Sequence, residues 1–298
     1  MMETACSASE SKETLLYSHL INTIGAAYFE SNNLKKCRIH FENARDLRER
    51  LLPENDLQVA VSLANLGNVE TAEGLYDEAQ ILLEEAARIR ELQKEPLMLG
   101  LSFLQLGRVW FLRNEFDHAR QMYSKADACF AKRGAEDPLY MANLNYAYGN
   151  LELEKALLSR QVSSTEGYEQ ALRYYIQVKE ACDAHAPFHQ LAAANFYKMA
   201  CTEFSLNHPG KALAYLEKAF NVAEIRSSGE VDGTIARIWF KKSEILIDDD
   251  IRREEGIQLR KEVTAHHENI VDALGLTFDA DELFTDKAFD ILVPGYFR

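Results

Sequence analysis

Histidines and cysteines are the residues whose types and spacing could bind a metal ion, and they form three short groups: His185 with His189, Cys37 with His40, and His266 and His267 beside Glu268. His185 and His189 have the i, i+4 spacing that places two imidazoles on one helical face, but Pro187 lies between them and interrupts a helix. Cys37 occupies a position at which related stretches of the chain carry small packing residues. We therefore predict surface or core roles for these residues and no metal site.

Catalytic chemistry also has few candidates. Cys201 follows Lys198 by three residues, and an ammonium group at that spacing could lower the pKa of the thiol, but we interpret Cys201 as an ordinary buried cysteine. The run Asp248-Asp249-Asp250 is typical of a turn or a solvated face. Neither of the glycine-rich strings that bind phosphate, G-x-x-x-x-G-K-[ST] and G-x-G-x-x-G, occurs. We expect no enzymatic activity and no cofactor.

Composition limits the class of partner. The 298 residues carry 33 Lys and Arg against 47 Asp and Glu, a formal net charge of −14. No basic run could neutralise a row of phosphates, so we expect neither nucleic acid nor a membrane surface as a partner. The five scattered cysteines are typical of reduced thiols, the N-terminus lacks a signal-peptide pattern, and no uninterrupted apolar run is long enough to span a membrane. We expect a cytoplasmic location and leave the nucleus open.

The elements that must position any site are indicated by a recurring glycine. Gly25, Gly67, Gly107 and Gly149 stand in similar apolar stretches, at nearly equal intervals along the chain. A fifth copy has Ala200 in this position and a sixth has Ser243. Glycine in the middle of a helix costs roughly 0.5–1 kcal/mol relative to alanine, so a repeated one needs a packing reason. We predict that it lets a large side chain of a partner helix approach the backbone.

The second half of each unit keeps the same register. A small residue follows the glycine position by twelve residues, a large one by sixteen and an alanine by nineteen; the large ones are Phe41, Leu83, Tyr123 and Leu216. In the fourth copy the corresponding residues Ala171, Tyr175 and Val178 come ten residues late, which indicates an insertion around residues 160–169. The sixth copy restores no such trio, and we interpret it as a degenerate end unit.

Proline, glycine and asparagine mark the ends of these elements. Pro53, Pro96, Pro138 and Pro187 fall between units, where proline ends one helix before the next begins. Asn32-Asn33, Gly74, Asn114 and residues 207–210 fall inside units, at the predicted turn between two paired helices. The sequence therefore predicts an all-α protein of about six antiparallel helical hairpins.

The strings QLGRVW and ARQMYSKA resemble the tetratricopeptide repeat (TPR) family, and the resemblance extends over about residues 16–269. Each unit is roughly 40 residues long, which exceeds the usual repeat and is similar to the long-repeat subclass that includes kinesin light chains. The style of the chain is also similar to filamentous-fungal TPR proteins. The resemblance implies a right-handed superhelical solenoid whose first helices line a concave groove. We expect a disordered tail over 1–12, a repeat domain over 13–272 and a C-terminal cap or tail over 273–298.

The family geometry also implies which side chains face the groove. The candidate peptide-binding residues are Asn22, Asn65, Asn68, Arg108, Asn143, Tyr146, Asn150, Tyr197, Lys198, Arg237 and Lys241. An asparagine side chain both donates and accepts, so it can pair with the backbone of a bound peptide without reading its sequence. The same asparagines could equally be solvated polar residues on an open face.

The four basic residues in this set admit two interpretations. They could bind an acidic group or a terminal carboxylate of a ligand, or they could be ordinary surface charges. The groove positions do not match the pattern of the clamp that binds acidic tails of heat-shock chaperones, because only one of its five positions fits. We therefore do not predict a chaperone clamp.

The function that these observations favour is a non-enzymatic adaptor that binds a peptide segment of another protein in its groove. The alternative is a sensor or oligomerisation arm derived from a nucleotide-switch receptor whose catalytic domain is absent from this chain. A purely structural spacer is a further possibility. The identity of the partner and the oligomeric state are not indicated by the sequence.

Overall fold

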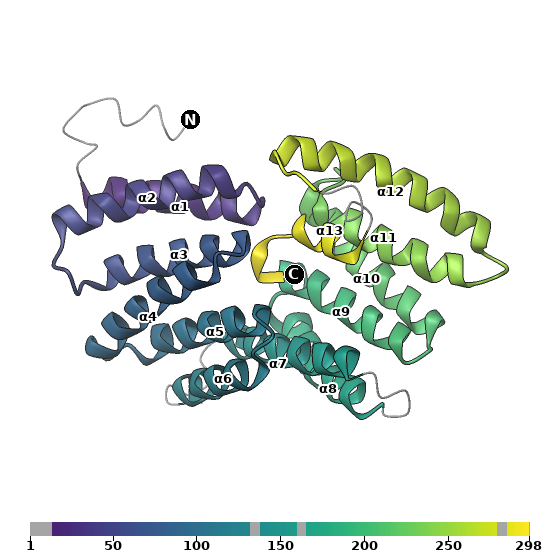
Figure 1. The fold of residues 1–298 in the computed structure, drawn as a ribbon, viewed down its shortest axis with the longest axis horizontal. Coiled ribbons are helices and arrows are strands. Elements are labelled where there is room, and N and C mark those ends of the chain that lie inside the picture. Colours follow the sequence, from purple (N-terminus) through teal and green to yellow (C-terminus); the bar gives the residue numbers. More distant parts are fainter. Residues whose placement is uncertain (1–13, 132–137, 160–164, 279–284, 298) are drawn as a thin grey trace. The chain divides into compact units, whose positions relative to one another are not determined.

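The structure is a computed structural model that describes residues 14–131, 138–159, 165–278 and 285–297, and Figure 1 shows its ribbon. Within those ranges the chain forms thirteen α-helices and no strand, which confirms the predicted all-α fold of consecutive helical hairpins. Two compact units divide it. Unit 1 comprises residues 1–134 together with 294–296, and unit 2 comprises residues 135–293 together with 297–298.

Three hairpins make up most of unit 1: α1 (Leu15–Glu30) with α2 (Leu34–Leu51), α3 (Leu57–Glu73) with α4 (Tyr76–Leu92), and α5 (Pro96–Leu112) with α6 (Phe116–Ala131). Unit 2 contains α7 (Pro138–Leu158) with α8 (Glu166–His185), α9 (Gln190–Ser205) with α10 (Pro209–Ser227), α11 (Gly233–Asp248) with α12 (Arg253–Leu274), and the short helix α13 (Asp286–Ile291). A 3₁₀ turn, Gly295–Phe297, follows α13. The two helices of each hairpin pack against each other.

The recurring glycine is the contact point inside each hairpin, as predicted. A Cβ atom built on Gly67 in α3 would lie 2.7 Å from Cγ of Leu83 in α4, which is closer than real Cβ contacts allow. A Cβ atom on Gly107 would lie 2.5 Å from Cδ1 of Tyr123. Because Leu83 and Tyr123 are buried directly against these glycines, their packing offsets the intrinsic cost of glycine in a helix.

The fourth hairpin confirms the late register that the sequence predicts. A Cβ atom on Gly149 in α7 would lie 2.5 Å from Cε1 of Tyr175 in α8, which is the residue that takes the large position ten places late. Helix α7 is 21 residues long and α8 begins at Glu166, so these two helices supply part of the extra length. Residues 160–164 of the predicted insertion lie outside the described residues.

The sixth hairpin is more regular than the sequence interpretation allowed. Its trio is present one residue late: Gly256, Arg260 and Val263 on α12 follow Ser243 on α11. Arg260 donates from Nε to the hydroxyl of Ser243 at 2.7 Å and its guanidinium lies 4.0 Å from the ring centroid of Phe240. The repeat pattern of this unit is hidden in the sequence because a half-buried arginine takes the position at which the other units carry an aromatic or aliphatic residue.

Local sequence explains where the helices begin and end. Asn32, Asn114 and Asn207 have φ angles of 57°, 63° and 62°, a left-handed conformation that asparagine tolerates better than most residues, and Gly74 has a φ of 82°. Helices α5, α7 and α10 begin at prolines, whose missing N–H would have no partner in a first helical turn. These positions confirm the predicted turns and unit boundaries.

Two buried arginines link neighbouring hairpins of unit 1, a feature that the sequence analysis missed. Arg48 in α2 donates to the hydroxyl of Ser62 in α3 at 2.8 Å, and Arg90 in α4 donates to the hydroxyl of Ser102 in α5 at 2.6 Å. Each arginine follows the glycine of its own hairpin at one constant spacing, and each serine precedes the next glycine at another. The repeated spacing is therefore a signal that could have been found.

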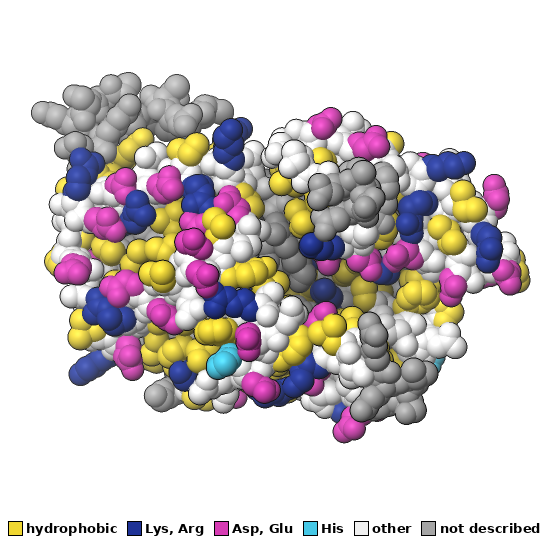
Figure 2. Space-filling model, viewed as in Figure 1, with side chains coloured by type: hydrophobic (Ala, Val, Ile, Leu, Met, Phe, Trp, Pro, Cys, Tyr) yellow, Lys and Arg dark blue, Asp and Glu magenta, His cyan; other side chains and the backbone are white. Residues whose placement is uncertain are grey.

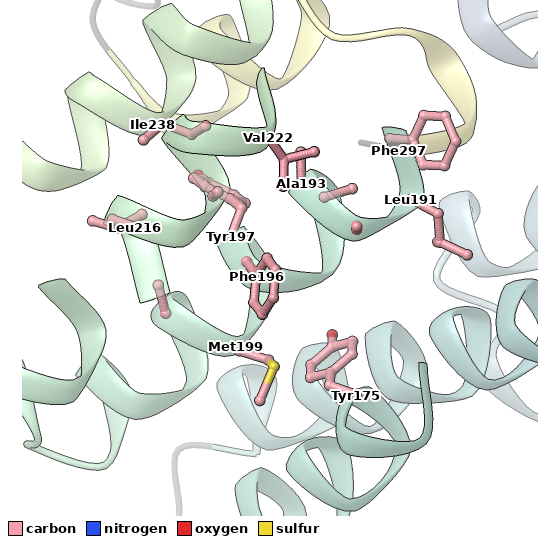
Figure 3. Close-up of a cluster of buried hydrophobic side chains, with 14 of the residues drawn as sticks. Tyr175, Leu191, Ala193, Phe196, Tyr197, Met199, Leu216, Val222, Ile238 and Phe297 are labelled. Carbon is pink, nitrogen blue, oxygen red and sulfur yellow. The ribbon is translucent and has the colours of Figure 1, made fainter. Parts of the chain in front are cut away.

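The largest hydrophobic core of unit 2 joins residues of α7 to α11 with two residues near the C-terminus. Figure 3 shows part of it, with Phe196 and Met199 of α9 and Tyr175 of α8 near one another. Val293 and Phe297 belong to the same cluster, with 1% and 8% of their surface exposed. Burial of these apolar side chains ties the C-terminal residues to the repeats of unit 2.

Figure 2 shows acidic and basic side chains interspersed with hydrophobic ones on the visible face. No helix among the described residues combines the length and the apolar character that crossing a membrane requires. The expected tail over 1–12 lies outside the described residues. The division into a repeat domain over 13–272 and a cap or tail over 273–298 stays a prediction.

Candidate peptide-binding surface

Side chains from the first helix of each hairpin in unit 1 meet at Tyr296. Asn68 on α3 donates a hydrogen bond from Nδ2 to the hydroxyl of Tyr296. The ring of Phe29 on α1 packs edge-to-face against the tyrosine, with 5.0 Å between centroids, and the guanidinium of Arg108 on α5 lies 5.5 Å from the tyrosine ring centroid. We call Phe29, Asn68 and Arg108 the tyrosine slot.

The tyrosine slot holds a neutral phenol. Tyr296 keeps 39% of its surface exposed, yet its hydroxyl end is covered, and this burial raises the pKa of Tyr296 to about 12 although the nearby Arg108 charge opposes the shift. The preceding residue also fits closely, because a Cβ atom on Gly295 would lie 2.9 Å from Cβ of Ala72 on α3. Residues 294–296 therefore lie directly on α3.

The other two predicted asparagines of unit 1 pair with each other. Nδ2 of Asn65 on α3 donates to Oδ1 of Asn22 on α1 at 2.9 Å, and the same oxygen lies 3.4 Å from Nη1 of Arg48. Both asparagines are half-buried. They link neighbouring hairpins, and any role in holding a peptide stays a prediction.

In unit 2 the central residue of the predicted set is Arg237 on α11, which has no exposed surface. Its Nη1 donates to Oδ1 of Asp290 at 3.0 Å and to the backbone oxygen of Phe297 at 2.9 Å. Its guanidinium lies 4.1 Å from the ring centroid of Tyr197 on α9. Its Nε and Nη2 atoms are buried and make no hydrogen bond with the part of the chain that the structure describes.

Two lysines complete a cationic cluster, which we define as Lys198, Arg237 and Lys241. Nζ of Lys241 on α11 lies 2.6 Å from Oδ2 of Asp286 and 2.6 Å from Oε2 of Glu244. Burial alone would lower the pKa of each of the three cations, but nearby carboxylates outweigh it, chiefly Asp290 for Lys198 and Arg237 and Asp286 for Lys241, so all three pKa values are raised. All three side chains are therefore charged at neutral pH.

Three further predicted residues of unit 2 lie on α7. The hydroxyl of Tyr146 donates to the backbone oxygen of Phe297 at 3.4 Å, and burial raises the pKa of Tyr146. Asn143 donates to the backbone oxygen of Leu139 in its own helix at 2.8 Å. Asn150 accepts from the hydroxyl of Tyr175 at 2.8 Å. Tyr146 thus contacts the C-terminal residues, whereas both asparagines are engaged inside their hairpin.

In each unit taken by itself, several of the predicted residues contact residues near the C-terminus, a pairing that the sequence analysis did not make. We call residues 285–297 the C-terminal segment. Within unit 1, its Tyr296 contacts Asn68 and Arg108. Within unit 2, its Phe297 contacts Tyr146, its Asp290 contacts Arg237 and its Asp286 contacts Lys241. The available signal was charge complementarity, since two aspartates four residues apart could have been paired with the predicted basic residues.

The metal and thiol candidates lie in packing or capping positions. His189 accepts a hydrogen bond from the backbone of Leu191 at the start of α9, and the ring of His267 lies 4.5 Å from that of Phe289. Burial raises the pKa of the Cys37 thiol to about 12 and raises that of Cys201 as well, so neither thiolate is favoured. No group of three metal-ligating side chains was found among the described residues.

The comparisons agree with this fold. Residues 16–92 match the family model described as tetratricopeptide repeat, while a search of curated proteins gave no match. BtubC (BKLC) from P. vanneervenii has a similar structure, with a TM-score of 0.61 and 16% sequence identity over 79% of this chain and 92% of that one.

Two similar structures contain a peptide. The Rap conjugation gene regulator of plasmid pLS20, solved with the Phr* peptide, gives a TM-score of 0.66 at 14% identity and covers 97% of this chain and 76% of that one. The structure of NprR in complex with its cognate peptide NprX gives a TM-score of 0.59 at 11% sequence identity, and the match covers 85% of this chain and 68% of that one. At such identities the likeness shows the fold alone. Residues 16–92 are therefore a tetratricopeptide repeat segment, and the chain has the fold of a tetratricopeptide-type helical repeat protein.

Proposed function

We propose that this chain is a non-enzymatic scaffold whose first helices bind a peptide segment of a partner protein. The observation that carries the proposal is that a peptide segment already lies on these helices. The backbone oxygen of Phe297 accepts hydrogen bonds from Arg237 and Tyr146, which are side chains of α11 and α7. Recognition of a backbone oxygen does not depend on the side chain of the bound residue, so the same donors suit other peptides.

Two further observations support the proposal. The tyrosine slot in unit 1 combines an aromatic ring, an amide donor and a guanidinium, a combination suited to an aromatic side chain with a polar tip. The similar structures of the Rap regulator and NprR are both complexes with peptides. The buried thiols, with their raised pKa values, give no sign of a catalytic nucleophile among the described residues.

Selection from a random peptide library on the immobilised full chain tests the proposal. Because the C-terminal segment already contacts the first helices, the selection is run in parallel on a double variant, Phe289→Ala with Asp290→Asn, that weakens these contacts. We call it the unlatched variant. A second double variant, Arg108→Ala with Lys198→Ala, removes two half-buried cations of the first helices, and we call it the face variant. The charge-matched control removes two exposed cations of second helices, Lys125→Ala with Lys218→Ala.

We expect enriched peptides to bind the control variant as they bind the unmodified chain. We expect their affinity for the face variant to fall by about tenfold or more, the loss of about 1.4 kcal/mol of binding free energy. Fluorescence anisotropy with labelled peptides measures both affinities. The proposal is overturned if neither selection enriches a peptide, or if the enriched peptides bind the face variant and the control equally well.

A further inference from the structure

We infer that the cationic cluster of unit 2 binds acidic peptide helices of the pattern Asp-x-x-Phe-Asp-x-Leu, and that residues 286–292 are an internal copy of this ligand that competes with it. The inference rests on the proposed function, because it names the ligand class and the regulation of the same surface. Figure 1 shows α13, which carries this pattern, beside α11, which carries two of the three cations.

Charge complementarity is the first observation. Lys241 contacts Asp286 at 2.6 Å, and Arg237 contacts Asp290 at 3.0 Å. The two aspartates are four residues apart, so one turn of helix places both carboxylates on the same side of α13. The chain as a whole has a net charge of −14, so the attraction for an acidic helix must come from these local cations.

The apolar side of α13 supplies the second observation. The ring of Phe289 stacks on that of Phe240 in α11, with centroids 4.1 Å apart, and Phe289 has no exposed surface. Leu292 belongs to the same hydrophobic cluster, with 3% of its surface exposed. Apolar residues three and six positions after Asp286 therefore anchor the helix while the aspartates meet the cations. This is the arrangement in which an amphipathic helix binds a groove.

The buried charge of Arg237 explains why α13 can leave its position only when another acidic peptide replaces it. A buried guanidinium without an anion is strongly unfavourable, so departure of Asp290 requires another carboxylate in its place. The buried Nε and Nη2 atoms, which bond to no described residue, leave donors for a carboxylate that binds with both oxygens. A competing peptide could therefore pair with Arg237 at least as well as Asp290 does.

The size and exposure of α13 favour exchange. A helix of six residues is too short to be stable alone, so α13 owes its structure to the surface on which it lies. The side chains of its two aspartates keep 51% and 29% of their surface exposed. Water and a competing carboxylate can therefore reach the pair of Lys241 and Asp286 first, whereas Arg237 is reached only as Asp290 moves away.

A labelled synthetic peptide of residues 285–297, TDKAFDILVPGYF, is the probe. It is added to the full unmodified chain and to the unlatched variant, whose own segment lacks the aromatic anchor and one carboxylate. We expect the unlatched variant to bind the probe at least about tenfold more tightly, because in the unmodified chain the internal copy reduces the competent fraction. A probe with both aspartates changed to asparagine should bind the unlatched variant about tenfold more weakly than the acidic probe.

Asp250→Asn is the matched control, because Asp250 belongs to an exposed ion pair with Arg253 on α12, and it should bind the probe as the unmodified chain does. If the unlatched variant fails to fold, Asp286→Asn replaces it, with an expected gain of about threefold. Equal binding by all variants, or binding by none, overturns the inference and makes α13 a permanent part of unit 2. In that case library peptides that depend on Arg108 and Lys198 would still support the proposed function.

Discussion

Oδ1 of Asp290 lies 3.0 Å from Nη1 of Arg237, and the arginine side chain has no contact with solvent. Replacement of the carboxylate by an amide keeps an acceptor oxygen but leaves the buried cation without the negative charge that pairs with it. We expect Asp290→Asn to lower the free energy of unfolding by about 2–3 kcal/mol, at or below the range for fully buried pairs because Asp290 is partly exposed. Urea unfolding followed by circular dichroism measures the change.

Two comparisons make this prediction specific. The exposed pair Asp250 and Arg253 should contribute little, so Asp250→Asn should change stability by less than about 1 kcal/mol. Combining Asp290→Asn with Arg237→Met should recover part of the loss, because the buried charge is then absent. Equal destabilisation by the buried and exposed substitutions would contradict the importance that we assign to the buried pair.

The glycine contacts predict a second result. In Gly107→Ala the new methyl group would overlap the ring of Tyr123 and lie 3.2 Å from the backbone oxygen of Ala119, which cannot move independently of its helix. We expect a loss of about 1–3 kcal/mol of unfolding free energy. Gly210→Ala is the control, since nothing lies within 4 Å of its Cβ position and alanine favours a helix. Thermal unfolding should separate the two variants in opposite directions.

His267 predicts how stability depends on pH. Burial lowers its pKa below 6.5, although the backbone of Ala288 and the charge of Glu268 oppose the shift. Because the folded state binds the proton less readily, His267 contributes stability above the unfolded pKa, and this contribution is lost as the pH falls through the folded pKa. Unfolding free energy should therefore decrease between pH 7.5 and pH 5, by at most about 1.4 kcal/mol per pH unit for one proton.

Substitution separates His267 from the other histidines. His267→Phe should reduce the slope of stability against pH, whereas His118→Gln, at an exposed position on α6, should leave it unchanged. Urea unfolding at several pH values measures the slopes. Identical slopes for His267→Phe and the unmodified chain would assign the acid sensitivity to other groups.

The fit of Gly295 against α3 predicts a spectroscopic change. In Gly295→Val the side chain would collide with Ala72, so Tyr296 should leave the tyrosine slot. The pKa of Tyr296 should then fall from about 12 towards the ordinary value of about 10. Nuclear magnetic resonance of ¹³C-labelled tyrosine measures this titration. Gly210→Val, at a position with free space, should leave Tyr296 unchanged, and a Tyr296 pKa that stays near 12 in Gly295→Val would show that the collision is relieved in another way.

The helical hairpins could be predicted because their contacts repeat. Each glycine and its large partner, such as Gly67 with Leu83, impose the same short-range packing requirement at nearly the same spacing. The turns could be predicted equally well, because asparagine and glycine adopt positive φ angles more easily than other residues. The sixth hairpin was missed because Arg260 packs its aliphatic stem and guanidinium where other units place an apolar residue.

Of the candidate site, the sequence predicts the residues on the repeat helices but not the residues that contact them. Arg108, Arg237 and Lys241 were identified from the positions that the family geometry assigns to the groove. The residues that contact them, Asp290 and Tyr296, could not be identified in the same way, because they lie far from these basic residues in sequence and belong to no repeat. Long-range pairing of single residues leaves no periodic signal, and charge complementarity alone does not say which carboxylate pairs with which cation.

The position of α13 limits how the array can grow. Phe289 of α13 and Leu292, which directly follows the helix, pack in one hydrophobic cluster with residues of both α11 and α12, the sixth described hairpin. A seventh repeat added after α12 would need that same surface for its own first helix. Hairpins inserted between earlier units would leave this packing intact, whereas a repeat stacked directly on α11 and α12 would have to displace α13.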